Sequence, residues 1–467
     1  MDGEYTITFR YEEFNQLKQH LFPGDKKEAV AFALCSIAKG VDKTRLLIRE
    51  IISLPKSAYI KRTPQEVLWE TSTLIPVLGR LEKENICLIK CHSHPDGIAE
   101  FSAVDDKSDK SLIPSFYEWN PAGPHASLVM CEDNVSARIV LDDGSFKPVN
   151  CIQVIGERLS WYRKGVAKKV KPEQQRLVQA FGEGTYSALS NLRIAVIGAS
   201  GIGSLVNESL MRTGVGEIVT VDPDHVDFVN LNRILYSTKE DAQNKANKTS
   251  LLRRSVATTG LDTKITELPC DLKTPDVIKH IAGCDLIMGC VDNREARQIL
   301  CRIATFYLLP YIDAGVAIRA ESKGEIESVS AAIHYIQPGQ SFISRGIFDI
   351  EALRSDAMQR SNPDQFKEQL NLGYVSGVDV ERPAAMPLNM IAAGYSVMEL
   401  LARIHGYRGD IEDDKRAAET LISVDIGYIK QRPDTALCTS LERYIGLGDV
   451  VPLLGMPVLS MQEEDAA

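Results

Sequence analysis

The stretch Leu192-Arg193-Ile194-Ala195-Val196-Ile197-Gly198-Ala199-Ser200-Gly201-Ile202-Gly203-Ser204 decides the fold of the second half of this chain. An apolar run leads into a glycine-rich turn, and a helical pattern begins directly after the turn. This order predicts a strand, a tight loop and a helix whose first N–H groups bind phosphate. Ser200 takes the place of the second glycine of G-x-G-x-x-G, so the stretch alone predicts only a nucleotide, for which a nicotinamide dehydrogenase is the usual interpretation.

Length and composition restrict the class of protein. The chain has 467 residues, which predicts two or three domains, and its 44% hydrophobic and 25% charged residues are typical of a globular protein. The net charge of −10 disfavours nonspecific nucleic-acid binding. No apolar stretch is long enough for a membrane helix, and the N-terminus has no signal-peptide pattern. The ten cysteines contain no C-x-x-C pair, which predicts reduced, mostly buried thiols in a cytoplasmic protein.

A histidine motif follows a predicted strand in the first third of the chain. His92-Ser93-His94-Pro95 comes directly after the mostly apolar stretch 85–91, and Phe101-Ser102-Ala103-Val104-Asp105 follows shortly afterwards. Alternate residues of a strand share a face, so both imidazoles can reach one ion. Two histidines and one carboxylate leave a fourth position for water, as in catalytic zinc sites. The alternative is a pair of exposed loop histidines near an acidic turn. The same patterning predicts further elements, namely strands at 28–37 and 44–53 and a helix at 64–83.

This spacing resembles the signature of the JAB/JAMM (MPN) metallopeptidases, which cleave isopeptide or peptide bonds after the C-terminus of ubiquitin-like proteins. The resemblance implies an α/β metallopeptidase domain with His92, His94 and Asp105 as zinc ligands. It implies Ser102 as the donor that steadies the tetrahedral oxyanion. It also implies an upstream glutamate as general base.

Glu28 is the predicted general base, because it stands at the head of the strand at 28–37, where the family places its glutamate. Zinc lowers the pKa of its water toward ~7, and a carboxylate within hydrogen-bond reach completes the nucleophile. Glu50 and Glu66 remain alternatives, each of which is expected to be a surface charge.

The chain after the glycine turn predicts a second strand at 217–221 that ends in Asp222, about 20 residues after the glycines. An acidic side chain at this place meets a ribose hydroxyl in nucleotide-binding folds. Asn230, Arg233 and Lys245 follow. A nicotinamide dehydrogenase has no need of these residues, whereas an enzyme that handles a triphosphate needs cations near the α-phosphate.

A buried-type strand at 284–291 ends in Asp292-Asn293. The carboxyl end of a parallel strand is where ligands bind in such folds, and a carboxylate there suits Mg²⁺.

Together these motifs resemble the ThiF/HesA-like adenylyltransferases, the fold of ubiquitin-activating enzymes, over roughly residues 176–406. The family pattern is represented by the glycine loop and by the stretches 222–233, 243–245 and 290–297. The resemblance implies a Rossmann-like, mostly parallel sheet and contacts to ATP or Mg²⁺, with Asp292 holding the metal. The implied contacts are Gly198, Gly201, Gly203, Asp222, Asn230, Arg233, Lys245, Asp292 and Asn293.

The same resemblance predicts a homodimer, because Arg176 matches an arginine that related enzymes insert into the partner's ATP site. Family members that form a thioester carry a cysteine in the crossover region, but residues 336–386 contain none. Cys438 is the only cysteine after Cys301 and is a weak candidate for a nucleophile. Adenylation without the usual thioester, or transfer to an acceptor such as a ubiquitin-conjugating-enzyme-like partner or a hydroxyl, is therefore expected.

The sequence thus predicts an α/β chain with a metallopeptidase domain at 1–158, a basic linker at 159–172, an adenylyltransferase domain at 173–425 and a tail at 426–467. The leading hypothesis is a bifunctional cytoplasmic enzyme that adenylates the C-terminus of a ubiquitin-like protein and trims or deconjugates it. Bacterial conjugation clusters, including antiphage defence, are an expected setting. The alternatives are the activation and processing of a sulfur-carrier protein, and a binding scaffold with inactive sites. Neither nucleic acid nor a membrane is an expected partner.

Overall fold

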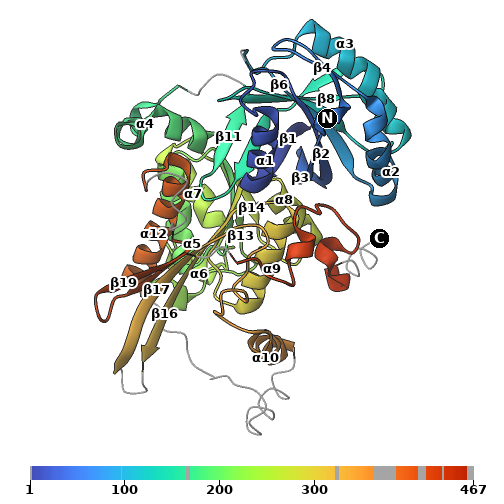
Figure 1. Ribbon diagram of the computed structural model, residues 1–467. Helices are drawn as coiled ribbons and strands as arrows, with labels where there is room; N and C mark the ends of the chain where they lie inside the picture. The colour runs from blue at the N-terminus through green and yellow to red at the C-terminus, as the bar shows by residue number, and fades with distance from the viewer. Residues whose placement is uncertain are drawn as a thin grey trace. The chain divides into compact units, whose positions relative to one another are not determined.

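The computed structural model describes residues 3–95, 97–164, 169–320, 325–361, 385–408, 417–433 and 436–459 (Figure 1). The chain divides into two compact units. The first unit contains Met1–Val166 together with Phe306–Leu308 and Ile445–Val451, and the second unit contains the rest. Among the described residues, no helix has the length and apolar character needed to cross a membrane.

The first unit is built on a nine-stranded mixed sheet with the order β11-β10-β1-β3-β2-β6-β7-β8-β9. Its strands are β1 (Glu4–Arg10), β2 (Val30–Lys39), β3 (Lys43–Ser53), β6 (Cys87–Ser93), β7 (His125–Met130), β8 (Val135–Val140), β9 (Phe146–Pro148), β10 (Cys151–Ile155) and β11 (Ser160–Arg163). Its helices are α1 (Tyr11–Leu21), α2 (Ile75–Glu84) and α3 (Ala103–Leu112), with short 3-10 turns at Lys56–Ala58, Thr71–Leu74 and Ile113–Glu118. The predicted strands at 28–37, 44–53 and 85–91 are confirmed as β2, β3 and β6.

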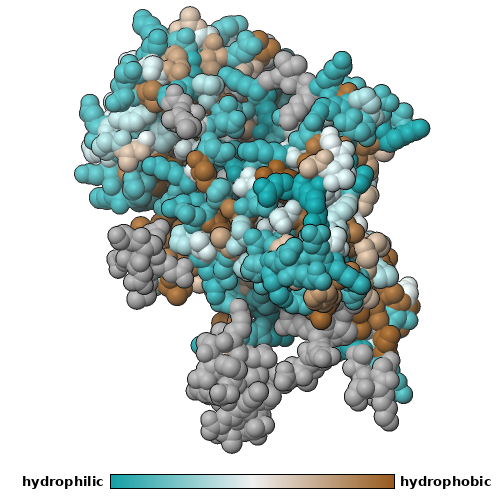
Figure 2. Space-filling view, turned by 180° about the vertical axis from the view of Figure 1, so that it is seen from behind, coloured by the Kyte–Doolittle hydropathy of each residue, from teal (hydrophilic) through white to brown (hydrophobic). Residues whose placement is uncertain are grey.

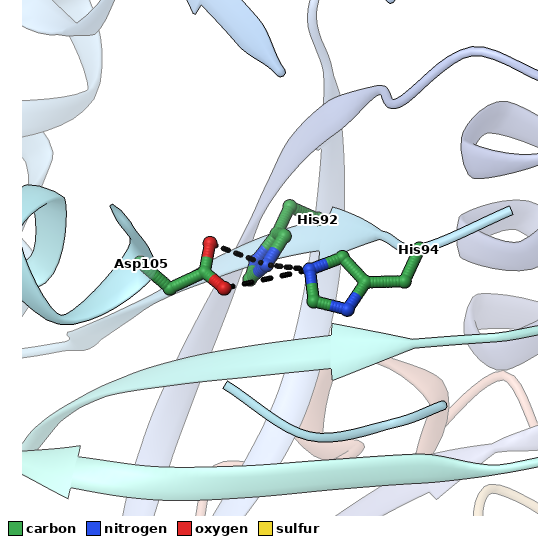
Figure 3. A group of neighbouring side chains, drawn as sticks. All are labelled: His92, His94 and Asp105. Carbon is green, nitrogen blue, oxygen red and sulfur yellow. Dashed lines mark hydrogen bonds and ion pairs between the residues drawn. The ribbon is translucent and has the colours of Figure 1, made fainter. Parts of the chain in front are cut away.

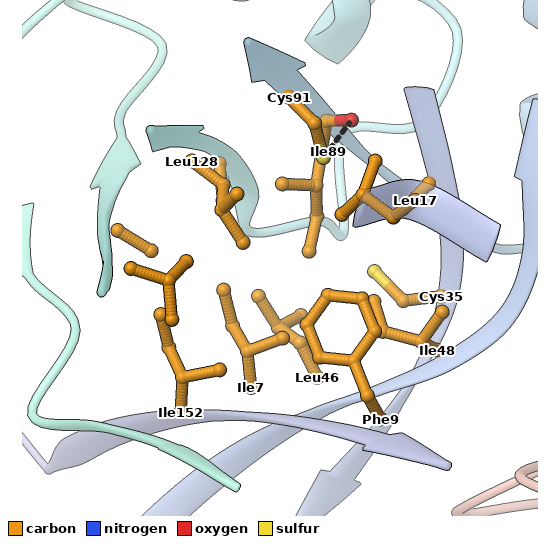
Figure 4. Close-up of a cluster of buried hydrophobic side chains, with 14 of the residues drawn as sticks. Ile7, Phe9, Leu17, Cys35, Leu46, Ile48, Ile89, Cys91, Leu128 and Ile152 are labelled. Atoms are coloured by element: carbon orange, nitrogen blue, oxygen red, sulfur yellow. Dashed lines mark hydrogen bonds between the residues drawn. The ribbon is translucent and has the colours of Figure 1, made fainter. Parts of the chain in front are cut away.

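Hydrophobic clusters cover both faces of this sheet. On one face Phe9 and Ile89 pack with Leu17 of α1, and all three side chains are fully buried (Figure 4). On the other face Phe32 and Leu88 pack with Leu81 of α2. Each such buried side chain contributes roughly 1.5–3 kcal/mol relative to an exposed one. Because the central strands are buried, their sequences are mostly apolar. These apolar runs make the strands recognisable in the sequence.

The helix predicted at 64–83 is wrong in its first half. Residues Val67–Trp69 form β5, which pairs antiparallel with β4 (Tyr59–Arg62) in a separate two-stranded sheet. The Trp69 ring packs edge-on against Phe32 at a centroid distance of 5.3 Å. Helix α2 begins only at Ile75, with Pro76 in its first turn, where proline is tolerated. Cross-strand pairing and the anchoring of Trp69 thus prevail over the helical spacing of the apolar residues.

The second unit is built on an eight-stranded sheet with the order β14-β13-β12-β15-β16-β17-β18-β19. Its strands are β12 (Arg193–Ile197), β13 (Glu217–Val221), β14 (Lys264–Leu268), β15 (Leu286–Gly289), β16 (Tyr311–Ala320), β17 (Ile326–Ile336), β18 (Glu419–Ser423) and β19 (Tyr428–Arg432). The first five strands in this order are parallel, and the last three add antiparallel. The predicted α/β fold with a mostly parallel sheet is confirmed for this unit.

Helices connect the parallel strands of this sheet, and the strand order reverses at β12. The helices are α4 (Gln175–Ser190), α5 (Gly201–Arg212), α6 (Lys239–Gln243), α7 (Ser250–Thr259), α8 (Pro275–Ala282), α9 (Arg294–Phe306), α10 (Ile350–Ser361) and α12 (Met386–His405). Short 3-10 turns lie at Pro172–Gln174, Phe228–Asn230, Glu442–Tyr444 and Leu453–Gly455. The chain runs outward from β12 through β13 to β14 and then returns to β15 on the other side of β12. Such a switch in strand order opens a crevice at the carboxyl ends of the strands, where ligands bind.

The predicted linker and tail contain regular structure. Strand β11 lies inside the stretch predicted as a linker, 159–172, and pairs antiparallel with β10. Strand β19 lies inside the predicted tail, 426–467, and pairs antiparallel with β18. Further along that tail the Asp449 N–H donates to the Ile37 carbonyl at 2.9 Å within the first unit. Residues 165–168 and 460–467 lie outside the described residues.

Candidate functional site

Three potential metal ligands meet at the end of β6 (Figure 3). His92 belongs to β6, His94 follows the strand directly, and Asp105 lies in the first turn of α3. His92 Nε2 lies 3.0 Å from Asp105 Oδ1, His94 Nε2 lies 3.4 Å from Asp105 Oδ2, and the two Nε2 atoms are 3.2 Å apart. No other group of three or more potential ligands occurs in the part of the chain that the structure describes.

These separations fit a zinc ion. Zn–N and Zn–O bonds of about 2.0–2.1 Å place two ligand atoms of a tetrahedral site about 3.3 Å apart. The observed distances of 3.0–3.4 Å come close to this value without movement of the backbone. Burial lowers the pKa of His92, which favours the neutral imidazole that binds metal. Burial opposes ionisation of Asp105, but its hydrogen bonds with His92 and His94 prevail and hold the pKa of this carboxyl well below its usual range.

Ser102 is the N-terminal cap of α3. Its hydroxyl donates to Asp105 Oδ2 at 2.7 Å, and the Asp105 N–H donates back to Ser102 Oγ at 3.2 Å. The Ser102 N–H also donates to Asp105 Oδ2 at 2.7 Å, which completes a capping box. The serine that the sequence assigns to oxyanion binding therefore also fixes the orientation of Asp105.

Glu28 lies next to this group. It lies two residues before Val30, the first residue of β2 and the register partner of His92. Its side chain is buried, and burial raises the pKa of Glu28 to about 7, while His94 lowers it and Asp105 raises it. The two alternatives lie in ion pairs elsewhere, Glu50 with Arg80 and Glu66 with Lys61. Among the three glutamates, Glu28 is the one that the structure brings to the histidines.

We expect Glu28→Gln to change how the stability of the metal-free protein depends on pH. The folded-state pKa of about 7 exceeds the unfolded value of 4.5, so the folded state binds this proton more tightly. Stability from this group is present below about pH 4.5 and is lost as the pH rises to about 7. At pH 8, Glu28→Gln should therefore have a higher free energy of unfolding than the native protein, by on the order of 1–3 kcal/mol, and a higher melting temperature. At pH 4.5 the two proteins should have about the same stability. Thermal melts after chelation measure this, and parallel pH profiles for the two proteins would contradict it.

The glycine loop of the second unit lies at the switch point between β12 and β15. Gly198 has a φ of +94°, and a Cβ added there would lie 2.6 Å from the Cys290 carbonyl oxygen. A Cβ on Gly203 would lie 1.8 Å from the Gly198 carbonyl oxygen. Neither position accepts a side chain without displacing backbone. The loop leads directly into α5, whose N-terminus at Gly201 faces the crevice.

A cavity of about 550 Å³ opens at this loop. It is lined by most of the predicted nucleotide contacts, namely Gly198, Gly201, Asp222, Asn230, Arg233, Asp292 and Asn293. The Asp222 carboxylate accepts hydrogen bonds from the Ala199 N–H at 2.7 Å and the Asp224 N–H at 2.9 Å. Burial raises the pKa of Asp222, and the nearby Lys248 opposes this rise. The structure thus brings the glycine loop and the ends of β13 and β15 to one cavity.

Arg233 supplies a cation to this cavity. Its guanidinium donates to the Val229 carbonyl at 2.6 Å and to Asn232 Oδ1 at 3.1 Å. It has no carboxylate partner within the described ranges. An arginine held by its own loop in this way is suited to phosphate oxygens.

Residues 173–436 match the model of the ThiF family. The chain belongs to the ThiF family. It is 27% identical over 168 residues to ubiquitin-like modifier-activating enzyme 5 of Dictyostelium discoideum, covering 33% of this chain and 41% of that protein. It is 27% identical over 139 residues to the sulfur carrier protein ThiS adenylyltransferase of Bacillus subtilis, covering 30% of this chain and 41% of that protein. This chain thus spans about two fifths of the length of these curated relatives.

Among solved structures, Escherichia coli MccB with ATP resembles this ThiF-family chain. The TM-score is 0.44 and the sequence identity is 17%, with 58% of this chain and 74% of that chain covered.

Two residues predicted for the ThiF-type site do not line the cavity. Gly203 packs against the loop backbone instead. Lys245 is 61% exposed and lies 2.7 Å from Asp227 Oδ2. Two lysines do line the cavity, Lys273 and Lys248, and the side chain of Lys248 is only 8% exposed. Its Nζ lies 2.7 Å from Asp224 Oδ2 and 4.0 Å from Asp222 Oδ1. Sequence reasoning selected Lys245 from its spacing to Gln243 and missed the second lysine three residues later.

We expect Lys248→Met to weaken ATP binding at least tenfold and Lys245→Met to change it less than twofold. A charge-assisted hydrogen bond to phosphate contributes about 1.5–3 kcal/mol, and a tenfold change in affinity corresponds to about 1.4 kcal/mol. Titration calorimetry with ATP and Mg²⁺ measures both variants, which lose the same charge at neighbouring positions. The reverse order of effects would show that Lys245 is the phosphate ligand.

Two further predicted residues belong neither to the group of potential metal ligands nor to the lining of the cavity at the glycine loop. Arg176 is exposed on α4 and donates to Gln179 Oε1 at 3.1 Å. Cys438 is buried, with its Sγ 3.2 Å from Ser440 Oγ. All ten cysteines are free thiols and most are buried, as predicted. Part of the cysteine-free crossover region, 362–384, lies outside the described residues.

Proposed function

We propose that this ThiF-family chain adenylates the C-terminus of a ubiquitin-like protein and hydrolyses bonds made to that same C-terminus. The observation that carries the first activity is the cavity at the switch point, where Arg233, Lys248 and Asp292 surround the glycine loop. Similarity to ubiquitin-like modifier-activating enzyme 5 supports ATP over a dinucleotide as the nucleotide. The observation that carries the second activity is the convergence of His92, His94 and Asp105.

In the adenylation reaction, a carboxylate oxygen of the substrate's C-terminus attacks the α-phosphorus of ATP, and the bond to pyrophosphate breaks. The N–H groups at the start of α5 bind phosphate, while Arg233 and Lys248 neutralise the charge that moves to the departing oxygens. Asp292 is the residue that would hold Mg²⁺, and Mg²⁺ supplies divalent charge at the phosphates. Asp222 is the proposed ribose contact, besides its hydrogen bonds to the loop.

In the peptidase reaction, His92, His94 and Asp105 would hold zinc, which supplies a Lewis-acid centre when bound. Glu28 takes the proton from the attacking water and passes it to the leaving amine. The Ser102 hydroxyl, which donates to Asp105 Oδ2 in this structure, would turn to donate to the tetrahedral oxyanion. The raised pKa of Glu28, about 7, suits a group that both accepts and returns a proton near neutral pH.

We further propose a homodimer in which Arg176 reaches the nucleotide site of the second copy. Helix α12 supports this because it leaves Met390, Tyr395 and Met398 exposed on one side. Hydrophobic side chains also reach the surface around β17 and β19, at the lower right of Figure 2, including Ile326 and Ile429. An acceptor such as a ubiquitin-conjugating-enzyme-like protein is a proposed further partner.

Activation of a sulfur-carrier protein is the second candidate function. The observation that favours it is the similarity to the ThiS adenylyltransferase of Bacillus subtilis. A deletion strain distinguishes the two functions. A requirement for a sulfur-containing cofactor supports the sulfur-carrier function, whereas loss of protein conjugates or of phage resistance without such a requirement supports a conjugation pathway.

The experiment that tests the adenylation activity is exchange of labelled pyrophosphate into ATP. The purified full-length protein is mixed with Mg²⁺, ATP and a β-grasp protein that is encoded near its gene and ends in glycine. Exchange that depends on the β-grasp protein is the expected result. Absence of exchange with every such candidate would contradict the proposed function.

A further inference from the structure

Three charged side chains are buried behind the proposed zinc ligands. Lys90 is 4% exposed, Asp109 is fully buried, and Arg138 is nearly so. Lys90 Nζ lies 2.8 Å from Asp109 Oδ1, and Arg138 Nη2 lies 2.7 Å from Asp109 Oδ2. Each carboxylate oxygen of Asp109 thus has its own cation. We call Lys90, Asp109 and Arg138 the Asp109 cluster.

Both the Asp109 cluster and the proposed zinc ligands include contacts between the same two elements, β6 and α3. Lys90 precedes His92 by two residues, so both side chains lie on the same face of the strand. Asp109 follows Asp105 by four residues, so both lie on the same face of the helix. Two strand residues span roughly 6.6 Å and four helical residues roughly 6 Å, so the spacings match. Lys90–Asp109 and His92–Asp105 are therefore consecutive contacts between the same two elements.

Arg138 connects a third element, β8, to the start of α3. Besides Asp109 it pairs with Asp106, the residue directly after the ligand Asp105. Its guanidinium lies between the rings of Phe101 and Phe146, at 3.9 and 3.7 Å from their centroids. Phe101 directly precedes Ser102, the cap of α3. Arg138 thus contacts the helix and the segment that leads into it.

We propose that Lys90, Asp109 and Arg138 are positioning residues that hold α3 in the register at which Asp105 meets both histidines before metal binds. This inference rests on the proposed zinc site. A shift of α3 along β6 would separate two buried ion pairs, and an uncompensated buried charge is strongly unfavourable. The cluster therefore keeps the metal-free site ordered, and zinc binding does not have to supply the free energy of ordering α3. Loss of the cluster should lower zinc affinity although no ligand is changed.

The test measures zinc affinity of the full-length protein by competition with a chromogenic chelator. Lys90→Met and Asp109→Asn should weaken zinc binding at least tenfold, within the 10–100-fold range typical of residues that support metal ligands. Lys90→Arg keeps the positive charge and should stay within threefold of the native affinity. Glu13→Gln is the matched control, because it breaks the ion pair between Arg10 of β1 and the buried Glu13 of α1 and should leave zinc affinity unchanged.

The absorption spectrum of the cobalt-loaded protein gives a second readout, because it reports the geometry around the metal. It should change for Lys90→Met and remain native for Lys90→Arg and Glu13→Gln. A folded Lys90→Met protein with native zinc affinity and a native cobalt spectrum would overturn the inference and leave the zinc site standing. A native protein that binds no zinc would overturn the proposed peptidase and the inference with it. If Asp109→Asn does not fold, the comparison of Lys90→Met with Lys90→Arg tests the inference.

Discussion

Asp292→Ala is expected to lower pyrophosphate exchange at least a hundredfold. Asp292 follows β15 at the carboxyl end of the sheet and lines the cavity together with Asn293 and the glycine loop. It is the residue proposed to hold Mg²⁺, so its loss would leave the phosphate charge to be neutralised by the basic side chains of the cavity without the metal. Removing one electrostatic stabiliser from such a site costs about 2.7–4 kcal/mol, which corresponds to a factor of about 10²–10³ in rate.

A matched control for Asp292→Ala is Asp276→Ala. Asp276 lies in the first turn of α8, its side chain is 86% exposed, and it does not line the cavity. Exchange should be native in this variant, and both variants should melt like the native protein. Exchange by Asp292→Ala within threefold of the native rate would remove Asp292 from the proposed reaction.

Asp105→Ala is expected to abolish zinc binding and to lower peptide-bond hydrolysis by about three orders of magnitude. Asp105 is the one ligand that contacts both histidines and is itself fixed by Ser102. Its loss removes a negative ligand, so the Lewis-acid chemistry worth several kcal/mol disappears with the metal. Zinc content after dialysis, and cleavage of a ubiquitin-like protein that carries a C-terminal extension, measure the two effects.

Metal removal provides the internal comparison. Chelation should abolish the proposed peptidase activity of the native protein, and added zinc should restore it, whereas added zinc should not restore the activity of Asp105→Ala. The control Asp143→Ala, in the exposed turn between β8 and β9, should behave like the native protein. Native zinc content in Asp105→Ala would show that the ligand set is wrong.

Local sequence patterns predicted the parts of the fold that depend on local chemistry. The strand before Gly198 and the strand that leads into His92 were recognisable because they are buried and mostly apolar. The close approach at Gly203 demands a residue without a side chain, so the glycine pattern carries real structural information. The helix predicted at 64–83 failed because Trp69 is anchored by Phe32, a contact that spans 37 positions and leaves no periodic signal.

The residues that the sequence could not supply are those whose role depends on distant neighbours. The spacing to Gln243 favoured Lys245, whereas the fold buries the neighbouring Lys248 beside Asp222 and Asp224. Asp109 meets Lys90 across 19 positions and Arg138 across 29, so no motif joins them. Such contacts arise from strand order and helix register, which the three-dimensional structure alone defines.

The central proposal is that both sites act on one C-terminus, and one measurement tests it most directly. A candidate ubiquitin-like protein is prepared in two forms, one ending at its glycine and one with a short extension beyond it, and each is assayed for pyrophosphate exchange. The native protein should support exchange with both forms, after a lag for the extended one. Asp105→Ala should support exchange only with the form that ends at glycine. Equal exchange by Asp105→Ala with both forms, or no exchange by the native protein with either form, would contradict the proposal.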